Sequence, residues 1–203
     1  MALKICKHAL VVVLLILMIS HAGFAGDPDI ISDFVLPPNT TIVGANYFTY
    51  TRLQSLFEAD PPEAFTVSKV TKVEFPALDG QSVSYAVLQF PSGAVNPPHT
   101  HPRGAELLFL VKGSLQVGFV DTANKLYTQT LQPGDMFVFP TGLIHYQICG
   151  HNPAIAISAF GSANAGTVSI PAAVFATGID ENILSKSFKT DIPTIEMLTF
   201  NIA

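Results

Sequence analysis

Apolar and polar residues alternate with a period of two through the middle of the chain, from about residue 68 to residue 170. Successive side chains of a β-strand point to opposite faces, so this period predicts strands that are buried on one side. Turn-forming residues separate the alternating segments. The predicted strands are residues 70–74, 82–90, 106–112, 114–120, 125–131, 136–139, 145–149 and 154–160. So many short strands predict an all-β sandwich or barrel.

The segments on either side of this region have other patterns. Residues 26–65 are rich in turn residues and contain one predicted short helix, at residues 47–57. After Pro171 the pattern is helical, with two or three short helices predicted over residues 171–177, 180–188 and 191–200 and a stop at Gly178. We therefore divide the chain into a leader (1–25), an N-terminal extension (26–65), a β-barrel (66–172) and a C-terminal helical segment (173–203).

The leader has the layout of a secretory signal peptide. Lys4 and Lys7 precede an unbroken apolar run over residues 9–19, and small residues follow, ending in Ala25. A membrane anchor is the alternative reading, but this run falls well short of the ~20 apolar residues that span a bilayer. We expect cleavage near Ala25, secretion, and no stable insertion in a membrane.

Charge and cysteine content narrow the range of partners. The net charge is −5, and removal of the leader takes away Lys4 and Lys7 but no acid, leaving −7. The remaining basic residues are scattered singly, which argues against nucleic acid as a partner. Cleavage also leaves Cys149 as the one cysteine, so no intramolecular disulfide is possible. Asn39 opens the glycosylation sequon Asn-Thr-Thr, which fits an exported protein.

Three histidines and one glutamate suggest a metal site. His99 and His101 are two residues apart on a predicted strand, so both side chains project from one face. Glu106 begins the next predicted strand, and His145 opens a later one. Together they form a candidate site of three nitrogens and one oxygen, without a thiolate to select a soft metal.

Each of these residues also has an ordinary structural reading. A single histidine on a strand is more often a surface residue or a hydrogen-bonded core residue, and we assign His151, in a predicted loop, in that way. Glu106 could lie on the solvent face of its strand. For the set, burial inside a barrel would require pairing or a metal, because unpaired buried polar groups cost several kcal/mol.

The spacing of these residues resembles the two cupin motifs. The first runs from Gly93 through Asn-Pro-Pro-His-Thr-His at residues 96–101, with four residues before Glu106 and six more before Gly113. The second runs from Gly134 through Pro-Thr-Gly at residues 140–142 to His145. The stretches 96–103 and 134–140 are similar to the germin-like proteins of plants. That resemblance implies a secreted jelly-roll β-barrel with one manganese ion, Mn²⁺, per subunit, assembled as a homohexamer, a trimer of dimers whose C-terminal helices clasp neighbouring subunits.

Iron and zinc remain open on the chemistry of the ligands, because the sequence does not fix which ion is loaded. The C-terminal helices leave a second alternative open. They carry many apolar residues, which could cover another subunit or cap the barrel of their own chain. These residues are Val174, Phe175, Ile183, Leu184, Phe188, Ile192, Ile195 and Leu198.

The chain departs from the germin-like pattern in three places. The cysteine pair that commonly closes the N-terminal loop is absent, and Cys149 stands where the second motif usually has asparagine. Buried cysteine packs as a small hydrophobe, so we expect loss of a hydrogen bond there and no new redox chemistry. Oxalate-oxidising germins place two asparagines near the metal; Asn96 matches one of them, and Ala86 replaces the other.

The resemblance implies an activity at His99, His101, Glu106 and His145. Asn96 and Gln147 are candidates to contact substrate or ligands, the latter because it lies two residues past His145 and so on the same face. Ordinary hydrogen bonding within the barrel explains Asn96 and Gln147 equally well. We expect a superoxide dismutase that produces hydrogen peroxide in the plant apoplast, with cell-wall or defence roles. Oxalate oxidase is the alternative, weakened by Ala86 because a dicarboxylate needs positioned donors. A third possibility is a non-catalytic metal-binding protein of the wall or of storage.

Overall fold

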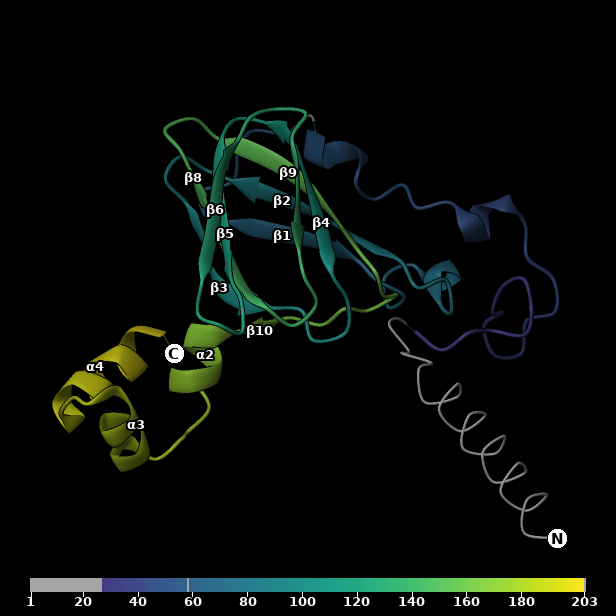
Figure 1. The fold of residues 1–203 in the computed structure, drawn as a ribbon. Coiled ribbons are helices and arrows are strands. Elements are labelled where there is room, and N and C mark those ends of the chain that lie inside the picture. Colours follow the sequence, from purple (N-terminus) through teal and green to yellow (C-terminus); the bar gives the residue numbers. More distant parts are fainter. Residues whose placement is uncertain (1–26, 58, 203) are drawn as a thin grey trace, which may run out of the picture.

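The computed structural model describes residues 27–57 and 59–202, so the predicted signal peptide lies outside the described residues. The described chain is built on two five-stranded sheets, in which all pairings are antiparallel. The first sheet has the order β1 (Thr66–Val70), β2 (Ser84–Phe90), β9 (Ala154–Phe160), β4 (Glu106–Lys112), β7 (Met136–Phe139). The second has the order β10 (Val168–Ser169), β3 (Val95–Thr100), β8 (Ile144–Cys149), β5 (Leu115–Val120), β6 (Leu126–Leu131). The prediction of an all-β fold is confirmed (Figure 1).

The core fills the space between the two sheets. Along β4, alternate positions are buried, so Glu106, Leu108 and Leu110 all point inward. Leu115 and Val117 of β5 face them from the other sheet and are fully buried as well. Full burial of such an aliphatic side chain contributes about 1.5–3 kcal/mol. The alternation that builds this core therefore also brings a carboxylate into it.

The first predicted strand was misplaced. The strand is β1, and residues 71–74 form a turn in which the Glu74 carboxylate accepts hydrogen bonds from Thr71 N (2.9 Å) and Thr71 Oγ1 (2.6 Å). A side-chain hydrogen bond of this kind competes with the ladder bonds of a strand. The alternation of apolar and polar residues at 70–74 therefore lies mostly in a turn and does not mark a strand.

The helix predicted over residues 47–57 is wrong. The structure has two separate one-turn 3-10 helices, η1 (Ala45–Phe48) and η2 (Gln54–Phe57), with Thr49 extended at φ −121° and ψ 126°. Three of the five intervening residues, Thr49, Tyr50 and Thr51, are β-branched or aromatic and have low helix propensity. A further 3-10 helix, η3 (Pro76–Leu78), follows β1.

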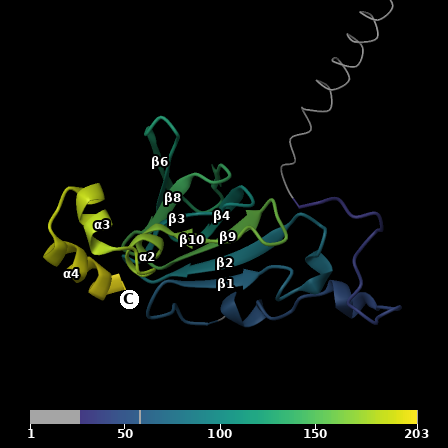
Figure 2. The ribbon, with the colours of Figure 1, turned by 90° about the horizontal axis from the view of Figure 1, so that it is seen from below.

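Hydrogen bonds and aromatic contacts hold the N-terminal extension, which lies along the β1 and β2 side of the barrel (Figure 2). Tyr47 Oη donates to Val35 O at 2.8 Å, and the rings of Phe34 and Phe48 meet edge to face with centroids 5.1 Å apart. These contacts lie in the segment where the germin-like pattern has its cysteine pair.

Asp27 anchors the start of the described chain to the loop after β9. Ser162 Oγ donates to Asp27 Oδ1 at 2.7 Å, and Ala163 N donates to Asp27 Oδ2. Ser162 is fully buried, and its carbonyl oxygen accepts from Ser84 Oγ of β2 at 2.7 Å. One carboxylate thus ties the N-terminal extension to the barrel.

Three helices end the chain: α2 (Ile170–Phe175), α3 (Glu181–Phe188) and α4 (Ile192–Ile202). The Asp180 side chain caps α3 by accepting hydrogen bonds from Asn182 N and Ile183 N. In Figures 1 and 2, α3 and α4 stand to the side of the barrel, beyond α2. No helix among the described residues is long and apolar enough to cross a membrane.

We predict that Asp27→Ala destabilises the barrel. The substitution leaves the buried Ser162 hydroxyl without its acceptor, which costs about 1–3 kcal/mol. The melting temperature should fall by roughly 2–4 °C for each kcal/mol lost in a protein of this size. Thermal unfolding followed by circular dichroism measures the change, with Asp29→Ala at an exposed neighbouring position as the control. Equal melting of Asp27→Ala and the unmodified protein would contradict the role given to Asp27.

Candidate metal centre

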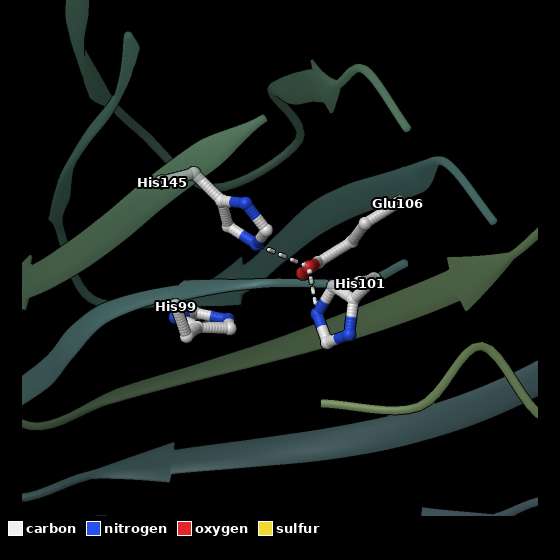
Figure 3. A group of neighbouring side chains, drawn as sticks. All are labelled: His99, His101, Glu106 and His145. Atoms are coloured by element: carbon white, nitrogen blue, oxygen red, sulfur yellow. Dashed lines mark hydrogen bonds and ion pairs between the residues drawn. The ribbon is translucent and has the colours of Figure 1, made fainter. Parts of the chain in front are cut away.

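The four predicted ligands meet inside the barrel. One ligand atom from each of His99, His101, Glu106 and His145 lies within 4.8 Å of the others, and all four residues are buried (Figure 3). Glu106 Oε2 lies 3.0 Å from His101 Nε2 and 3.1 Å from His145 Nε2. The structure therefore brings these four side chains together, as the sequence predicts.

The two sheets supply the ligands from opposite sides. His99 of β3 and His145 of β8 are direct cross-strand partners in the second sheet, and Glu106 faces them from β4 of the first. His101 follows immediately after the end of β3. Gly142 N donates to His101 O at 3.1 Å, which joins the segment before His145 to the segment after β3.

A β-bulge sets the direction of His99. The pairing of β3 with β8 runs from Asn96 opposite Gln147 to His99 opposite His145, so three steps on β3 match two on β8. The extra residue falls at Pro97 and Pro98, neither of which has an N–H for the ladder. Without the bulge, Asn96 and His99 would face opposite sides of the sheet, because they are an odd number of residues apart. The bulge lets both face the barrel interior.

Backbone carbonyls fix the orientation of all three imidazoles. His99 Nδ1 lies 2.8 Å from Pro97 O, His145 Nδ1 lies 2.9 Å from Leu143 O, and His101 Nδ1 lies 2.5 Å from Gly166 O. A carbonyl oxygen can only accept, so each Nδ1 carries the proton. Each Nε2 is then left with a free lone pair, the form in which a histidine binds a metal.

Glu106 is positioned by contacts on both of its neighbouring strands. Ser158 Oγ of β9 donates to Glu106 Oε1 at 2.5 Å, which leaves Oε2 directed to the imidazoles. Phe139 and Phe160 are the cross-strand partners of Glu106. Phe139 stacks on His145 with centroids 4.4 Å apart, and Phe160 meets His101 at 4.7 Å. The apolar walls therefore restrict the same side chains that the hydrogen bonds orient.

Burial shapes the protonation of the site. It lowers the pKa of His99 to about 4, and the nearby His145 adds to this effect. Burial raises the pKa of Glu106, but while His101 and His145 are also protonated at Nε2, their hydrogen bonds and charges outweigh burial and bring it to about 2; a bound metal ion would replace those Nε2 protons. At neutral pH the site thus combines a neutral His99 with an ionised carboxylate. Both are the forms that bind a cation.

These residues fit a divalent metal ion on the chemistry of their donors. An ionised carboxylate buried beside three imidazoles has a net negative charge, and a cation would balance it. Nitrogen and oxygen donors suit manganese, iron or zinc. The chain therefore has a buried three-histidine, one-glutamate site for a metal ion.

The site opens on a cavity of about 220 Å³, lined in part by Asn96, His99, His101 and Glu106. Asn96 Nδ2 donates to Gln147 Oε1 at 2.6 Å, and Gln147 Nε2 is buried with no hydrogen-bond partner among the described residues. Ala86 also lines this cavity. Asn96 and Gln147 thus form one polar pair beside the ligands. Ala86, which replaces the second asparagine, lines the same cavity as Asn96.

Other residues named from the sequence lie outside this site. Asn39 is exposed in a turn of the N-terminal extension, with φ 63°. His151 is exposed in the loop after β8, as assigned. Cys149 is buried in the core, burial raises the pKa of its thiol, and Sγ donates to Asn152 O at 3.1 Å. The thiol therefore keeps a local hydrogen bond at the position where asparagine is usual.

Sequence reasoning missed Ser158 and the three carbonyl acceptors. Ser158 is 52 residues from Glu106 in the chain and is one serine in an ordinary alternating strand. A backbone carbonyl has no sequence signature. Strand register, which the sequence does not state, was needed to find these groups.

Comparisons with known proteins agree with the geometry. The profile of the Cupin family matches residues 54–196. The chain is 57% identical over 182 residues to "Germin-like protein 9-3" of Oryza sativa subsp. japonica, covering 86% of this chain and 85% of the relative. It is 53% identical over 193 residues to "Germin-like protein 9-1" of the same organism, covering 92% and 77%. Among solved structures, an oxalate oxidase in complex with the substrate analogue glycolate superposes with a TM-score of 0.78 at 29% identity, covering 87% of this chain and 98% of that one.

We predict that Glu106→Gln lowers metal content well below that of the unmodified protein. The amide keeps the shape of the side chain but removes the charge that balances the cation. Added Mn²⁺ at 100 times its dissociation constant should stabilise the unmodified protein by about 2.7 kcal/mol, and this stabilisation should be lost in the variant. Elemental analysis and thermal unfolding with and without Mn²⁺ measure both effects. Glu63→Gln, at an exposed position, is the control; a Glu106→Gln protein with full metal content would show that the carboxylate is not a ligand.

Proposed function

Because the chain belongs to the cupin family and, within it, to the germin-like proteins, we propose that it is a secreted manganese superoxide dismutase of the plant apoplast. One observation carries this proposal: four buried donor atoms within 4.8 Å of one another lie beside a cavity that a small anion can enter. The products of dismutation are dioxygen and hydrogen peroxide, formed from two superoxide ions and two protons. The peroxide would serve cell-wall or defence roles.

His99, His101, Glu106 and His145 would hold one manganese ion per subunit. When bound, manganese supplies the alternating loss and gain of one electron that dismutation requires. The carboxylate of Glu106 favours the higher oxidation state because its negative charge stabilises the more positive ion. Asn96, held by Gln147, presents an amide at the cavity wall, and the carbonyl-bound imidazoles keep their Nε2 atoms in place before the metal arrives.

Secretion rests on the predicted leader and on the exposed sequon. Asn39 stands in a solvent-exposed turn, as a glycosylated asparagine must. The acidic charge predicted for the mature chain and its lack of disulfide pairing are compatible with an apoplastic protein held by packing and assembly.

Oxalate oxidase is the second candidate, favoured by the solved structure reported above. Against it stands Ala86, which lines the cavity with no hydrogen-bond donor where oxalate-oxidising germins have an amide. Loss of one neutral hydrogen bond costs about 0.5–1.5 kcal/mol, and a bond to a charged group is worth more. Superoxide asks less of the cavity, since it is a diatomic anion. A metal-loaded protein that turns over neither substrate would support the non-catalytic alternative.

We predict that superoxide dismutation follows the manganese content of the protein. Removal of metal by a chelator should abolish the activity, and Mn²⁺ should restore it. Zn²⁺ can occupy the same type of ligand set but has no redox chemistry, so the zinc-loaded protein is the matched inactive control. Superoxide and oxalate assays on one preparation, with metal analysis, make the measurement. Full activity in metal-free or zinc-loaded protein would overturn the proposal.

Assembly as a homohexamer, a trimer of dimers, is part of the proposal, and exposed apolar surface supports it. Leu184 and Ile195 are buried in the helical segment, whereas Met197 and Phe200 of α4 are 57% and 84% exposed. The helices stand beside the barrel, so they leave these residues free to cover another subunit. The outer face of the first sheet adds an apolar row of Tyr85, Ala159, Leu107 and Val138, each opposite the next on neighbouring strands.

We predict that Phe200→Ser reduces the size of the assembly. Large buried aromatic side chains contribute most to interfaces, and truncation of such an anchor typically costs about 2 kcal/mol or more. Sedimentation velocity at several concentrations should show smaller species than for the unmodified protein. Val73→Ser is the control, because Val73 is 70% exposed in the turn after β1. If both variants sediment like the unmodified protein, α4 does not contribute to the interface.

A further inference from the structure

A lysine lines the cavity that leads to the metal site. Lys69 lies on the edge strand β1, directly opposite Ala86 of β2. Val67 and Lys69 are two residues apart, so they share the face of β1 that borders the cavity. Within the described part of the chain, Lys69 and Glu106 are the charged side chains of the cavity wall. A cation thus stands on the same wall as the metal ligands.

The register places Lys69 within a short distance of Glu106. Lys69, Ala86 and Ser158 form one row across three neighbouring strands. With strands about 4.8 Å apart, the Cα atoms of Lys69 and Ser158 are about 10 Å apart. Ser158 Oγ contacts Glu106 Oε1 at 2.5 Å. Ala86 is the small residue between them, so no bulky side chain in this row separates the lysine from the metal ligands.

The charge of Lys69 is not neutralised by an ion pair among the described residues. Lys72 provides the contrast, because its Nζ lies 2.8 Å from Asp79 Oδ1. The charge of Lys69 helps to lower the pKa of Glu74, but the Glu74 carboxylate accepts hydrogen bonds from Thr71 N and Thr71 Oγ1 and forms no ion pair with the lysine. Lys69 is exposed, so its ammonium group is available at the mouth of the cavity.

We propose that Lys69 recruits small anions into the cavity that leads to the metal site. This proposal rests on the proposed metal-dependent function, because the recruited anion would bind at the metal ion. The mature chain is expected to be acidic overall and would repel an anion at long range. A cation at the entrance reverses the sign of the local potential and raises the local anion concentration. Its position opposite Ala86 also gives a carboxylate a partner where the asparagine amide is missing.

Anion binding to the manganese-loaded protein tests this role without turnover. Azide represents a small monoanion such as superoxide, and oxalate represents a dicarboxylate; calorimetry measures both affinities at low and high ionic strength. Lys69→Met keeps an unbranched side chain and removes the charge, and Lys69→Glu reverses it. Lys112→Met changes the net charge equally at the end of β4 remote from Glu106, so it is the matched control.

Lys69→Met should weaken both anions by roughly three- to fivefold at low salt, the effect of losing one exposed charge interaction. Lys69→Glu should weaken them further, and the differences should shrink at high salt because counter-ions screen exposed charges. Lys112→Met should bind both anions like the unmodified protein. Unchanged affinities in both Lys69 variants, or an equal loss in Lys112→Met, would overturn the proposal. Absence of superoxide dismutation with these affinity changes intact would instead count against the proposed enzyme.

Discussion

The rest of the site depends on one ionised carboxylate held among three imidazoles between two sheets. Glu106 is 2% exposed, and its two oxygens are divided between Ser158 Oγ and the imidazoles of His101 and His145. Such a group is costly to bury without partners. Hydrogen bonds that orient all four ligand side chains offset this cost, and the negative charge of the pocket favours a bound cation. Metal binding and barrel stability are therefore properties of the same interaction.

Orientation of the histidines comes from the backbone. Three carbonyl oxygens hold three Nδ1 protons, so the ligand atoms face inward before any ion is bound. One of these carbonyls, Gly166 O, belongs to the loop between β9 and β10, which Asp27 contacts through Ser162 and Ala163. The N-terminal extension and the site are thus connected through one loop. In a chain without a disulfide in this region, Asp27 supplies a long-range link by hydrogen bonding.

The role proposed for Lys69 adds the cavity wall to the metal ligands as a part of the site that meets an incoming anion. Ala86 and Lys69 both line the cavity and are direct cross-strand partners. The position that lacks an amide donor, Ala86, is therefore directly beside the cation of Lys69.

The sequence by itself predicted most of the strands, the C-terminal helices and the four candidate ligands, because each depends on local period or on spacing within a motif, but it did not predict β10. It misplaced the first strand and joined η1 and η2 into one helix, since a Thr71–Glu74 turn and an extended Thr49 look regular in a periodic pattern. Only the tertiary structure placed Ser158 on Glu106, Lys69 opposite Ala86, and Asn96 on the same face as His99. Register and a bulge decide these contacts, and both arise from pairing between segments that are distant in the chain.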